Sequence, residues 1–197
     1  MFLSAPPDDE VVQAIYRDSK SEEGYVQNYV RLWCWRPDVH NAFSGTRGLL
    51  LDRTTLSERE IAVLNSTTAS VLGDSYCSIA WGTRLAKVSD SATAAAVLRR
   101  EETPGLSQRE RALVAWATAV VAHPSGTTRQ DVEALQSSGF SEREIFDATL
   151  LVAFRLAFST VNDALGAQPD QQLANAAPPE VLESVNFGRS VTYASVE

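Results

Sequence analysis

Three times in this chain, a serine followed three residues later by a glutamate stands before a run of regularly spaced apolar residues. The three copies are Ser57-x-x-Glu60, Ser107-x-x-Glu110 and Ser141-x-x-Glu144. Such a pair forms a capping box, in which the serine hydroxyl accepts a backbone N–H and the glutamate accepts the serine's own N–H, so each copy predicts a helix start. The apolar residues then recur with a period near 3.6, and no stretch alternates convincingly with period two. We therefore predict an all-α fold with a weak internal repeat.

Further helices are expected from the same periodicity at residues 9–19, 23–34, 74–88, 90–100 and 129–137. The helix that starts at Ser141 and extends to residue 165 carries two apolar stripes, which is typical of a helix in the centre of a bundle. Beyond Gly166 the chain becomes rich in Gln, Asn, Ala and Pro and carries only isolated apolar residues such as Phe187 and Tyr193. This composition predicts a tail that frays or an arm that docks on a neighbouring subunit.

The charge balance limits the classes of partner. The net charge is −8, from 25 acidic and 17 basic residues, and the basic residues do not cluster, which argues against nucleic acid or an anionic membrane as the main partner. Neither a long apolar run nor a charged leader segment is evident, so a cytoplasmic location is expected. In that reducing compartment the two cysteines, Cys34 and Cys77, are expected to remain thiols.

Cys77 lies where a thiol can be reactive. Gly73 is typical of a helix end, Asp74 or Ser75 of the next helix cap, and Cys77 then falls in the first helical turn, where unpaired N–H groups favour the thiolate. An ionised Asp74 would instead raise the pKa of the thiol by like-charge repulsion, so the direction of the net pKa shift is open. Trp81 follows Cys77 by four residues, so it shares a helix face with the thiol.

Each of these residues also has a purely structural interpretation. Cys77 could be a small buried side chain, Asp74 a helix cap, and Trp81 a core or interface aromatic. Arg155 lies within the most apolar helix, where we expect an internal ion pair with Asp163 or Glu60, the alternative being contact with an acidic substrate group. The two histidines lack spaced carboxylates, so neither a metal site nor a cofactor is predicted.

Several segments carry a resemblance to a known family. They are Leu56-Ser57-Glu58-Arg59-Glu60-Ile61, Tyr76-Cys77 through Gly82, Leu106-Ser107-Gln108-Arg109-Glu110, and Asp131-Val132-x-x-Leu135-x-x-x-Gly139-Phe140-Ser141-x-x-x-Ile145. With these segments, over about residues 10 to 170, the chain resembles the alkylhydroperoxidase D-like (AhpD-like) and carboxymuconolactone decarboxylase family, in particular its two-lobed peroxidase-related members. The resemblance implies an AhpD-like helical bundle, one domain over residues 1–170, followed by the tail or arm 171–197.

Redox members of this family carry the motif Cys-x-x-Cys-x-x-x-His, whose three positions correspond here to Asp74, Cys77 and Trp81. Cys77 matches the second cysteine, which attacks the peroxide, whereas the resolving cysteine and the histidine are replaced. Glu60 resembles the glutamate of the family's proton relay, but it lies about two residues too far from Asp74, so capping is the better interpretation of Glu60. The candidate catalytic residues are Cys77, Asp74 and Glu60, and the candidate substrate-binding residues are Tyr76, Trp81 and Arg155.

The resemblance implies a peroxidase-type oxidoreductase in which the Cys77 thiolate attacks a hydroperoxide and becomes a sulfenic acid. Reduction of that acid would need an outside thiol or Cys34. Two alternatives stay open: a non-redox lyase or isomerase acting on a small acidic metabolite, as in the decarboxylase branch, and a binding protein without turnover. A homo-oligomer is also expected, as a trimer, hexamer or dimer, because the aromatic and apolar content exceeds what one small helical core readily buries.

Overall fold

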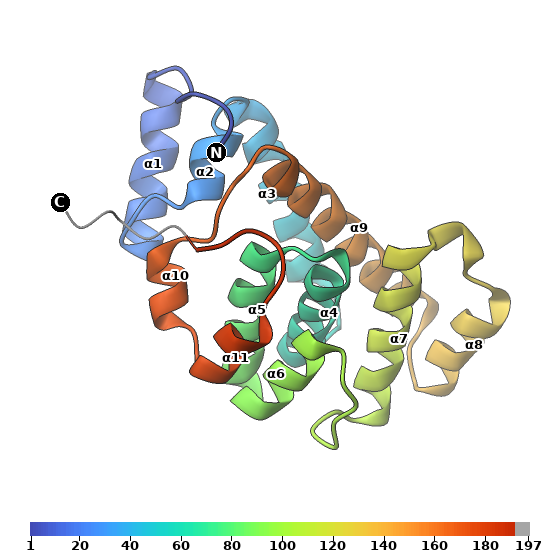
Figure 1. Cartoon of the computed structure of the whole chain (residues 1–197). Coiled ribbons are helices and arrows are strands. Elements are labelled where there is room, and N and C mark those ends of the chain that lie inside the picture. The colour runs from blue at the N-terminus through green and yellow to red at the C-terminus, as the bar shows by residue number, and fades with distance from the viewer. Residues whose placement is uncertain (192–197) are drawn as a thin grey trace.

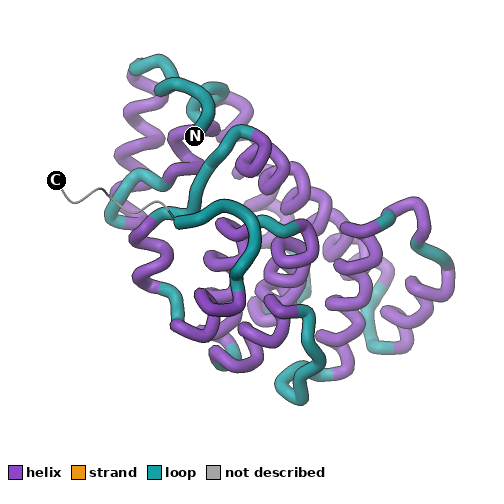
Figure 2. The backbone as a smooth tube through the Cα atoms, viewed as in Figure 1, coloured by secondary structure: helices purple, strands orange, loops and turns teal. Residues whose placement is uncertain are grey.

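The computed structural model describes residues 1–191, which form eleven α-helices and one short 3-10 helix and contain no β-strand (Figures 1 and 2). The helices are α1 (Glu10–Glu23), α2 (Asn28–Trp33), α3 (Pro37–Arg53), α4 (Glu58–Leu72), α5 (Ser75–Val88), α6 (Ser91–Arg99), α7 (Gln108–Ala122), α8 (Arg129–Ser137), α9 (Glu142–Ala164), α10 (Gln171–Ala176) and α11 (Pro179–Ser184), with the 3-10 helix η1 at Pro124–Gly126. Figure 1 shows α1 and α2 at one end of the molecule and α8 at the other. The all-α prediction is confirmed.

The three predicted capping boxes start helices α4, α7 and α9. In each box the serine Oγ accepts the backbone N–H of the glutamate at 3.2 Å, and the glutamate carboxylate accepts the serine backbone N–H. A fourth box, which the sequence reasoning did not single out, joins Thr128 and Asp131 at the start of α8. These local signals therefore determine where α4, α7, α8 and α9 begin.

Helix α4 occupies the centre of the bundle and packs against α5, α6, α7 and α9 (Figure 1). Its buried residues run without a break from Ala62 to Ser70, and most of them are small, so neighbouring helices can approach it closely from several sides. The sequence had favoured 141–165 as the central helix. In the structure α9 buries one of its two apolar stripes, whereas Phe146 on the other stripe is 66% exposed.

Helix α3 was not expected as a helix. It has 17 residues and none of them is buried, because its apolar residues do not form a stripe with helical spacing. Pro37 at its first turn favours the helical start, since proline fixes a helical φ there. This exposed helix matters for the site, because it forms one wall of the main cavity.

The segment predicted as a tail or arm is partly folded onto the rest of the chain. Residues 171–191 include α10 and α11, and Val181 of α11 is fully buried against α5 and α6. The apolar core therefore continues beyond residue 170. An arm reaching a neighbouring subunit, and the homo-oligomer itself, stay predictions, and Tyr193 lies outside the described residues.

Residues 185–191 cross the start of helix α5. The Ser75 hydroxyl donates to the carbonyl of Arg189 at 2.7 Å, and the Arg189 guanidinium donates to the carbonyl of Asp163 at the end of α9. Gly188 has a left-handed φ of +71°, and a Cβ at this position would lie 2.6 Å from the carbonyl oxygen of Gly73. A glycine is therefore required for this backbone to approach α5 so closely.

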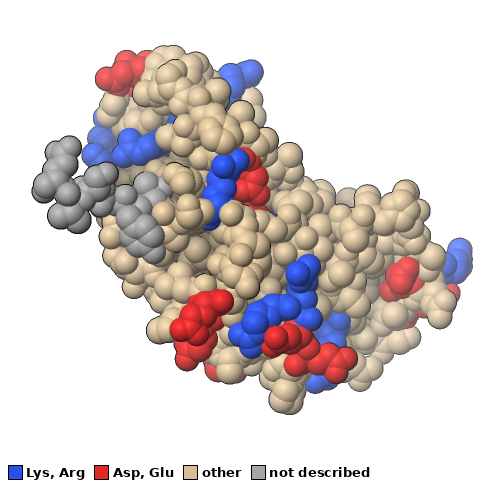
Figure 3. Space-filling view, viewed as in Figure 1, with Lys and Arg blue, Asp and Glu red and all other residues tan. Residues whose placement is uncertain are grey.

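Within the part of the chain that the structure describes, no helix is long and apolar enough to cross a membrane. Figure 3 shows small groups of basic and acidic side chains on one face, several of them side by side, separated by wide stretches of other residues. On that face, basic and acidic side chains lie in mixed groups rather than in separate patches of one sign.

Candidate functional site

The turn between α4 and α5 places Cys77 as the sequence predicts. Gly73 ends α4 with a left-handed φ of +85°, and Asp74 caps α5 by accepting the backbone N–H of Cys77 at 3.0 Å. The second carboxylate oxygen of Asp74 is buried and has no hydrogen-bond partner among residues 1–191. Asp74 is fully buried and does not line the main cavity, so its charge affects the thiol from the protein interior and not from the cavity.

The thiol of Cys77 lies against a guanidinium group. Nη1 of Arg155, from α9, is 3.1 Å from Sγ, and Nε of Arg155 donates to Oδ1 of Asn65 in α4 at 3.1 Å. The expected ion pair of Arg155 with Asp163 or Glu60 is wrong, because Arg155 pairs with a neutral amide and a sulfur. No carboxylate within residues 1–191 forms an ion pair with it, so its charge is directed at the thiol.

Burial decides the protonation state of Cys77. Its side chain is almost completely enclosed, and this burial raises the pKa of the thiol to about 12; Arg155 acts to lower the pKa and Asp74 to raise it. The helix start therefore does not produce a resting thiolate. At neutral pH the free protein holds a protonated thiol with a cation in contact with its sulfur.

This pKa predicts how Cys77 reacts with iodoacetamide. Well below the pKa of a thiol, the thiolate fraction rises about tenfold per pH unit, so the alkylation rate of Cys77 should keep rising by that factor from pH 7 to pH 9.5. Peptide mass spectrometry at timed quenches measures the rate. A short cysteine peptide is the control, and its rate should level off near its pKa of about 8.5. If the alkylation rate of Cys77 levels off at the same pH as that of the peptide, burial does not set the pKa of this thiol.

The Cys77 side chain lies on the wall of a cavity of about 720 Å³. Helices α3, α5 and α9 supply most of the wall, and α10, the start of α4 and residues 23–29 around the α1–α2 connection supply the rest. The aromatic lining residues are Tyr25, Tyr29, Phe43, Tyr76, Trp81, Phe154 and Phe158. The charged ones are Glu23, Arg47, Glu58, Arg84, Lys87 and Arg155. Such a cavity suits a small molecule with an apolar body.

Trp81 is surrounded by cations. The guanidinium carbons of Arg155, Arg84 and Arg47 lie 5.2, 5.4 and 5.6 Å from the centre of its ring. The faces of an indole attract cations, so Trp81 holds positive charge beside the cavity. The predicted placement of Trp81 and Arg155 at one site with Cys77 therefore agrees with the geometry.

Tyr76 also lines the cavity, and its hydroxyl donates to the carboxylate of Asp170. Burial raises the pKa of Tyr76 far above its ordinary value, and Asp170 adds to the rise. Tyr76 thus stays protonated and ties α5 to the segment before α10. Its role in this geometry is to hold the wall of the cavity.

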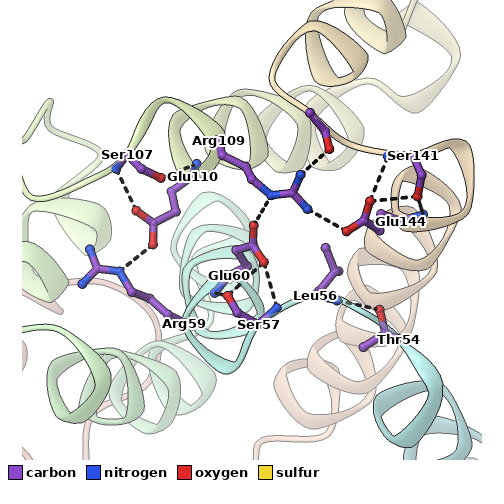
Figure 4. Close-up of polar contacts among 11 residues, drawn as sticks. Thr54, Leu56, Ser57, Arg59, Glu60, Ser107, Arg109, Glu110, Ser141 and Glu144 are labelled. Atoms are coloured by element: carbon purple, nitrogen blue, oxygen red, sulfur yellow. Dashed lines mark hydrogen bonds and ion pairs between the residues drawn. The ribbon is translucent and has the colours of Figure 1, made fainter.

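Glu60 does not reach the cavity. Figure 4 shows its carboxylate accepting hydrogen bonds from Ser57 of its own capping box and from Arg109 of α7. Arg109 also donates to Glu144 at the start of α9, at 2.7 Å, and in the same cluster Arg59 pairs with Glu110. Glu60 is therefore a structural cap, as its spacing favoured, and contacts none of the site residues named above.

Cys34 lies in a different part of the core from Cys77. It packs with Val12 of α1, Val30 of α2 and Val26 of the connection between them, whereas Cys77 packs with residues of α4, α5 and α6. Both cysteines are free, and burial raises the pKa of Cys34 to about 11. Within residues 1–191, no group of three or more His, Cys, Asp or Glu side chains is placed to hold a metal ion.

Sequence reasoning missed two residues of this site. Asn65 is a polar residue within the buried face of α4, and this unusual position was the available signal. Arg47 gave no signal, because it lies on α3, which was not expected as a helix.

Comparison with known proteins identifies the fold. No family model matches this chain, and no curated protein does. Among solved structures, a peroxidase-related protein from Silicibacter sp. TM1040 matches with a TM-score of 0.77 at 22% identity, covering 87% of this chain and 93% of that protein. An alkylhydroperoxidase AhpD core from Ralstonia eutropha JMP134 matches with a TM-score of 0.76 at 20% identity and the same coverages. This chain has the AhpD-like fold.

The debrominase Bmp8 has a similar structure, with a TM-score of 0.75 at 15% identity over 94% of this chain and 99% of Bmp8. A Bmp8 variant has been solved in complex with 2,3,4-tribromopyrrole. The AhpD-like fold implied by the sequence resemblance is thus confirmed. At these identities the likeness establishes the fold alone, and activity has to be argued from the site.

Proposed function

We propose that this AhpD-like protein reduces hydroperoxides through Cys77 alone. The observation that carries the proposal is the contact between Sγ of Cys77 and the guanidinium of Arg155 on the wall of a cavity large enough for a small organic molecule. An arginine that touches a sulfur and lacks a carboxylate partner among the described residues stabilises negative charge developing on that sulfur.

The chemical step balances with one thiol and one hydroperoxide. Sγ of Cys77 attacks the terminal peroxide oxygen, the S–O bond forms, and the O–O bond breaks. Sulfur is oxidised by two electrons to a sulfenic acid, and the peroxide is reduced to an alcohol. The thiol proton ends on the leaving alkoxide. Arg155 donates to the sulfur while it carries charge, and Asp74 fixes the first turn that presents the thiol.

Return to the thiol requires an outside reductant. The only other cysteine of the chain, Cys34, lies in a separate apolar cluster and is itself buried. One molecule of an external thiol would condense with the sulfenic acid and release water, and a second would reduce the mixed disulfide. Dithiothreitol can supply both thiols in an assay.

A second candidate is a non-redox activity on a small acid, and the raised pKa of Cys77 is the observation that favours it. A thiol that stays protonated at neutral pH is a weak nucleophile. Bmp8 shares the fold and is a debrominase, so the fold is not restricted to peroxides.

Graded exposure to cumene hydroperoxide tests the proposal, with Cys34→Ser as the matched control for Cys77→Ser. We expect Cys77 to gain oxygen before Cys34 in peptide mass spectrometry. Peroxide consumption with dithiothreitol should disappear in Cys77→Ser and persist in Cys34→Ser. Oxidation of Cys34 first, or equal consumption by the two variants, would refute the proposal and leave the non-redox activity or a binding role.

A further inference from the structure

We infer that the molecule bound in this cavity carries a carboxylate, and that Arg47 is the residue that binds it. The inference rests on the proposed function only in taking this cavity as the substrate site. It adds the chemical class of the substrate and a binding residue to that proposal.

The cavity is positively charged in an acidic protein. Four cations line it, Arg47, Arg84, Lys87 and Arg155, against two acids, Glu23 and Glu58, whereas the whole chain has a net charge of −8. A concave region whose charge is opposite to that of the protein around it concentrates ligands of the complementary sign. The expected ligand is therefore an anion.

Arg47 is the half-buried cation of the lining that lacks a partner; Lys87 has no ion pair among residues 1–191 either, but it is exposed to solvent. Arg84 pairs with Glu58 at 3.2 Å, and Arg155 is held by Asn65 and Cys77. For Arg47, no ion pair or hydrogen bond is present among residues 1–191, and its side chain contacts the face of Trp81 instead. Its five N–H donors are thus available to a ligand.

The surroundings of Arg47 favour the binding of an anion. Arg47 is half-buried, and burial together with the nearby Arg155 lowers the pKa of its guanidinium to about 10, so the group still carries its charge at neutral pH. A half-buried cation beside two other cations is stabilised when a carboxylate joins it, because guanidinium and carboxylate form paired, charge-assisted hydrogen bonds.

The position of Arg47 also orients the ligand. Arg47 and Arg155 contact the ring of Trp81, and Arg155 touches Sγ of Cys77. A ligand with its carboxylate on Arg47 can therefore extend past Trp81 toward the thiol. The rings of Phe43, Phe154 and Phe158 line the same space and suit an apolar or aromatic body.

The test compares two inert ligands of nearly equal size and shape, 4-isopropylbenzoate and 4-isopropylbenzamide, which differ in charge. Isothermal titration of the reduced full-length protein should show roughly tenfold to a hundredfold tighter binding of the benzoate, the range expected for hydrogen bonds to a charged group. Arg47→Gln should remove most of this preference. Arg47→Lys should keep part of it, because a lysine retains the charge but not the paired hydrogen bonds.

The control is Arg53→Gln, which removes one positive charge from the same helix at a position that does not line the cavity. It should leave the preference for benzoate intact. Equal affinities in the unmutated protein, binding of neither ligand at millimolar concentration, or an unchanged preference in Arg47→Gln would each overturn the inference. No turnover is involved, so an absence of peroxide reduction would refute the proposed function without affecting this measurement.

Discussion

Replacing Arg109 by methionine should lower the free energy of unfolding by about 3 kcal/mol, the low end of the range for removing one partner of a buried ion pair. Arg109 is 29% exposed and joins Glu60 and Glu144, whose side chains are 10% and 13% exposed, at the starts of two helices (Figure 4). Without it, both carboxylates lose their cationic partner while they stay largely enclosed. Urea denaturation followed by circular dichroism measures the change.

Arg143→Met is the matched control, because Arg143 occupies the same position of the third capping box. Its guanidinium makes one hydrogen bond, to the carbonyl of Arg53, and no ion pair within the described residues. Its cost should stay within about 0.5 kcal/mol, as for most surface changes. Equal costs for the two variants would show that the ion pairs of Arg109 contribute little to stability.

The same cluster gives the direction of a pH effect. Burial acts to raise the pKa of Glu144, but hydrogen bonds from Ser141 and from Arg109 outweigh it and hold the pKa at about 2, below the ordinary value of 4.5. A carboxyl with a lowered folded-state pKa stabilises the fold above its unfolded-state pKa, and this contribution disappears as the pH falls through the folded value. The difference in the free energy of unfolding between the native protein and Arg109→Met should therefore be largest near pH 6. It should shrink as the pH falls from about 4.5 to 2.

Replacing Arg155 by glutamine should reduce kcat/KM for cumene hydroperoxide about a hundredfold, a typical effect of removing one donor to a developing negative charge. Glutamine can still hydrogen-bond to Asn65 but brings no charge to Sγ of Cys77. Stopped assays with dithiothreitol give kcat/KM, and circular dichroism checks the fold.

Two further measurements separate an electrostatic role of Arg155 from a packing role. Arg155→Lys should recover part of the activity, because it restores a cation near the sulfur. Alkylation of Cys77 by iodoacetamide should slow in Arg155→Gln at fixed pH, since Arg155 acts to lower the thiol pKa. Unchanged alkylation and unchanged kcat/KM in a folded Arg155→Gln protein would remove Arg155 from the proposed mechanism.

Features encoded by neighbouring residues could be predicted from the sequence. The three serine and glutamate boxes, the end of α4 at Gly73 and the cap at Asp74 each depend on residues within four positions of one another. Their geometry follows from backbone hydrogen bonding at helix ends, which is the same in every fold. Cys77 was placed correctly for this reason.

Features that depend on distant residues could not be predicted. The partner of Arg155 is Asn65, ninety positions away, and neither a charge pattern nor a spacing connects them. The direction of the Cys77 pKa shift depends on how completely other helices enclose it, and the helix start alone suggested the opposite sign. No residue of helix α3 is buried, so the helix lacks the apolar stripe by which helices are detected in a sequence.

The glycine at position 188 has a consequence for anyone who engineers this chain. Between α11 and residue 191 the polypeptide resembles a spacer, yet its backbone at Gly188 lies directly against the turn that presents Cys77. Exchanging these residues for a generic flexible linker, or fusing a reporter after Ser184, would remove the cover from the first turn of α5. Insertions are better placed in the exposed connection around residues 100–105, between α6 and α7.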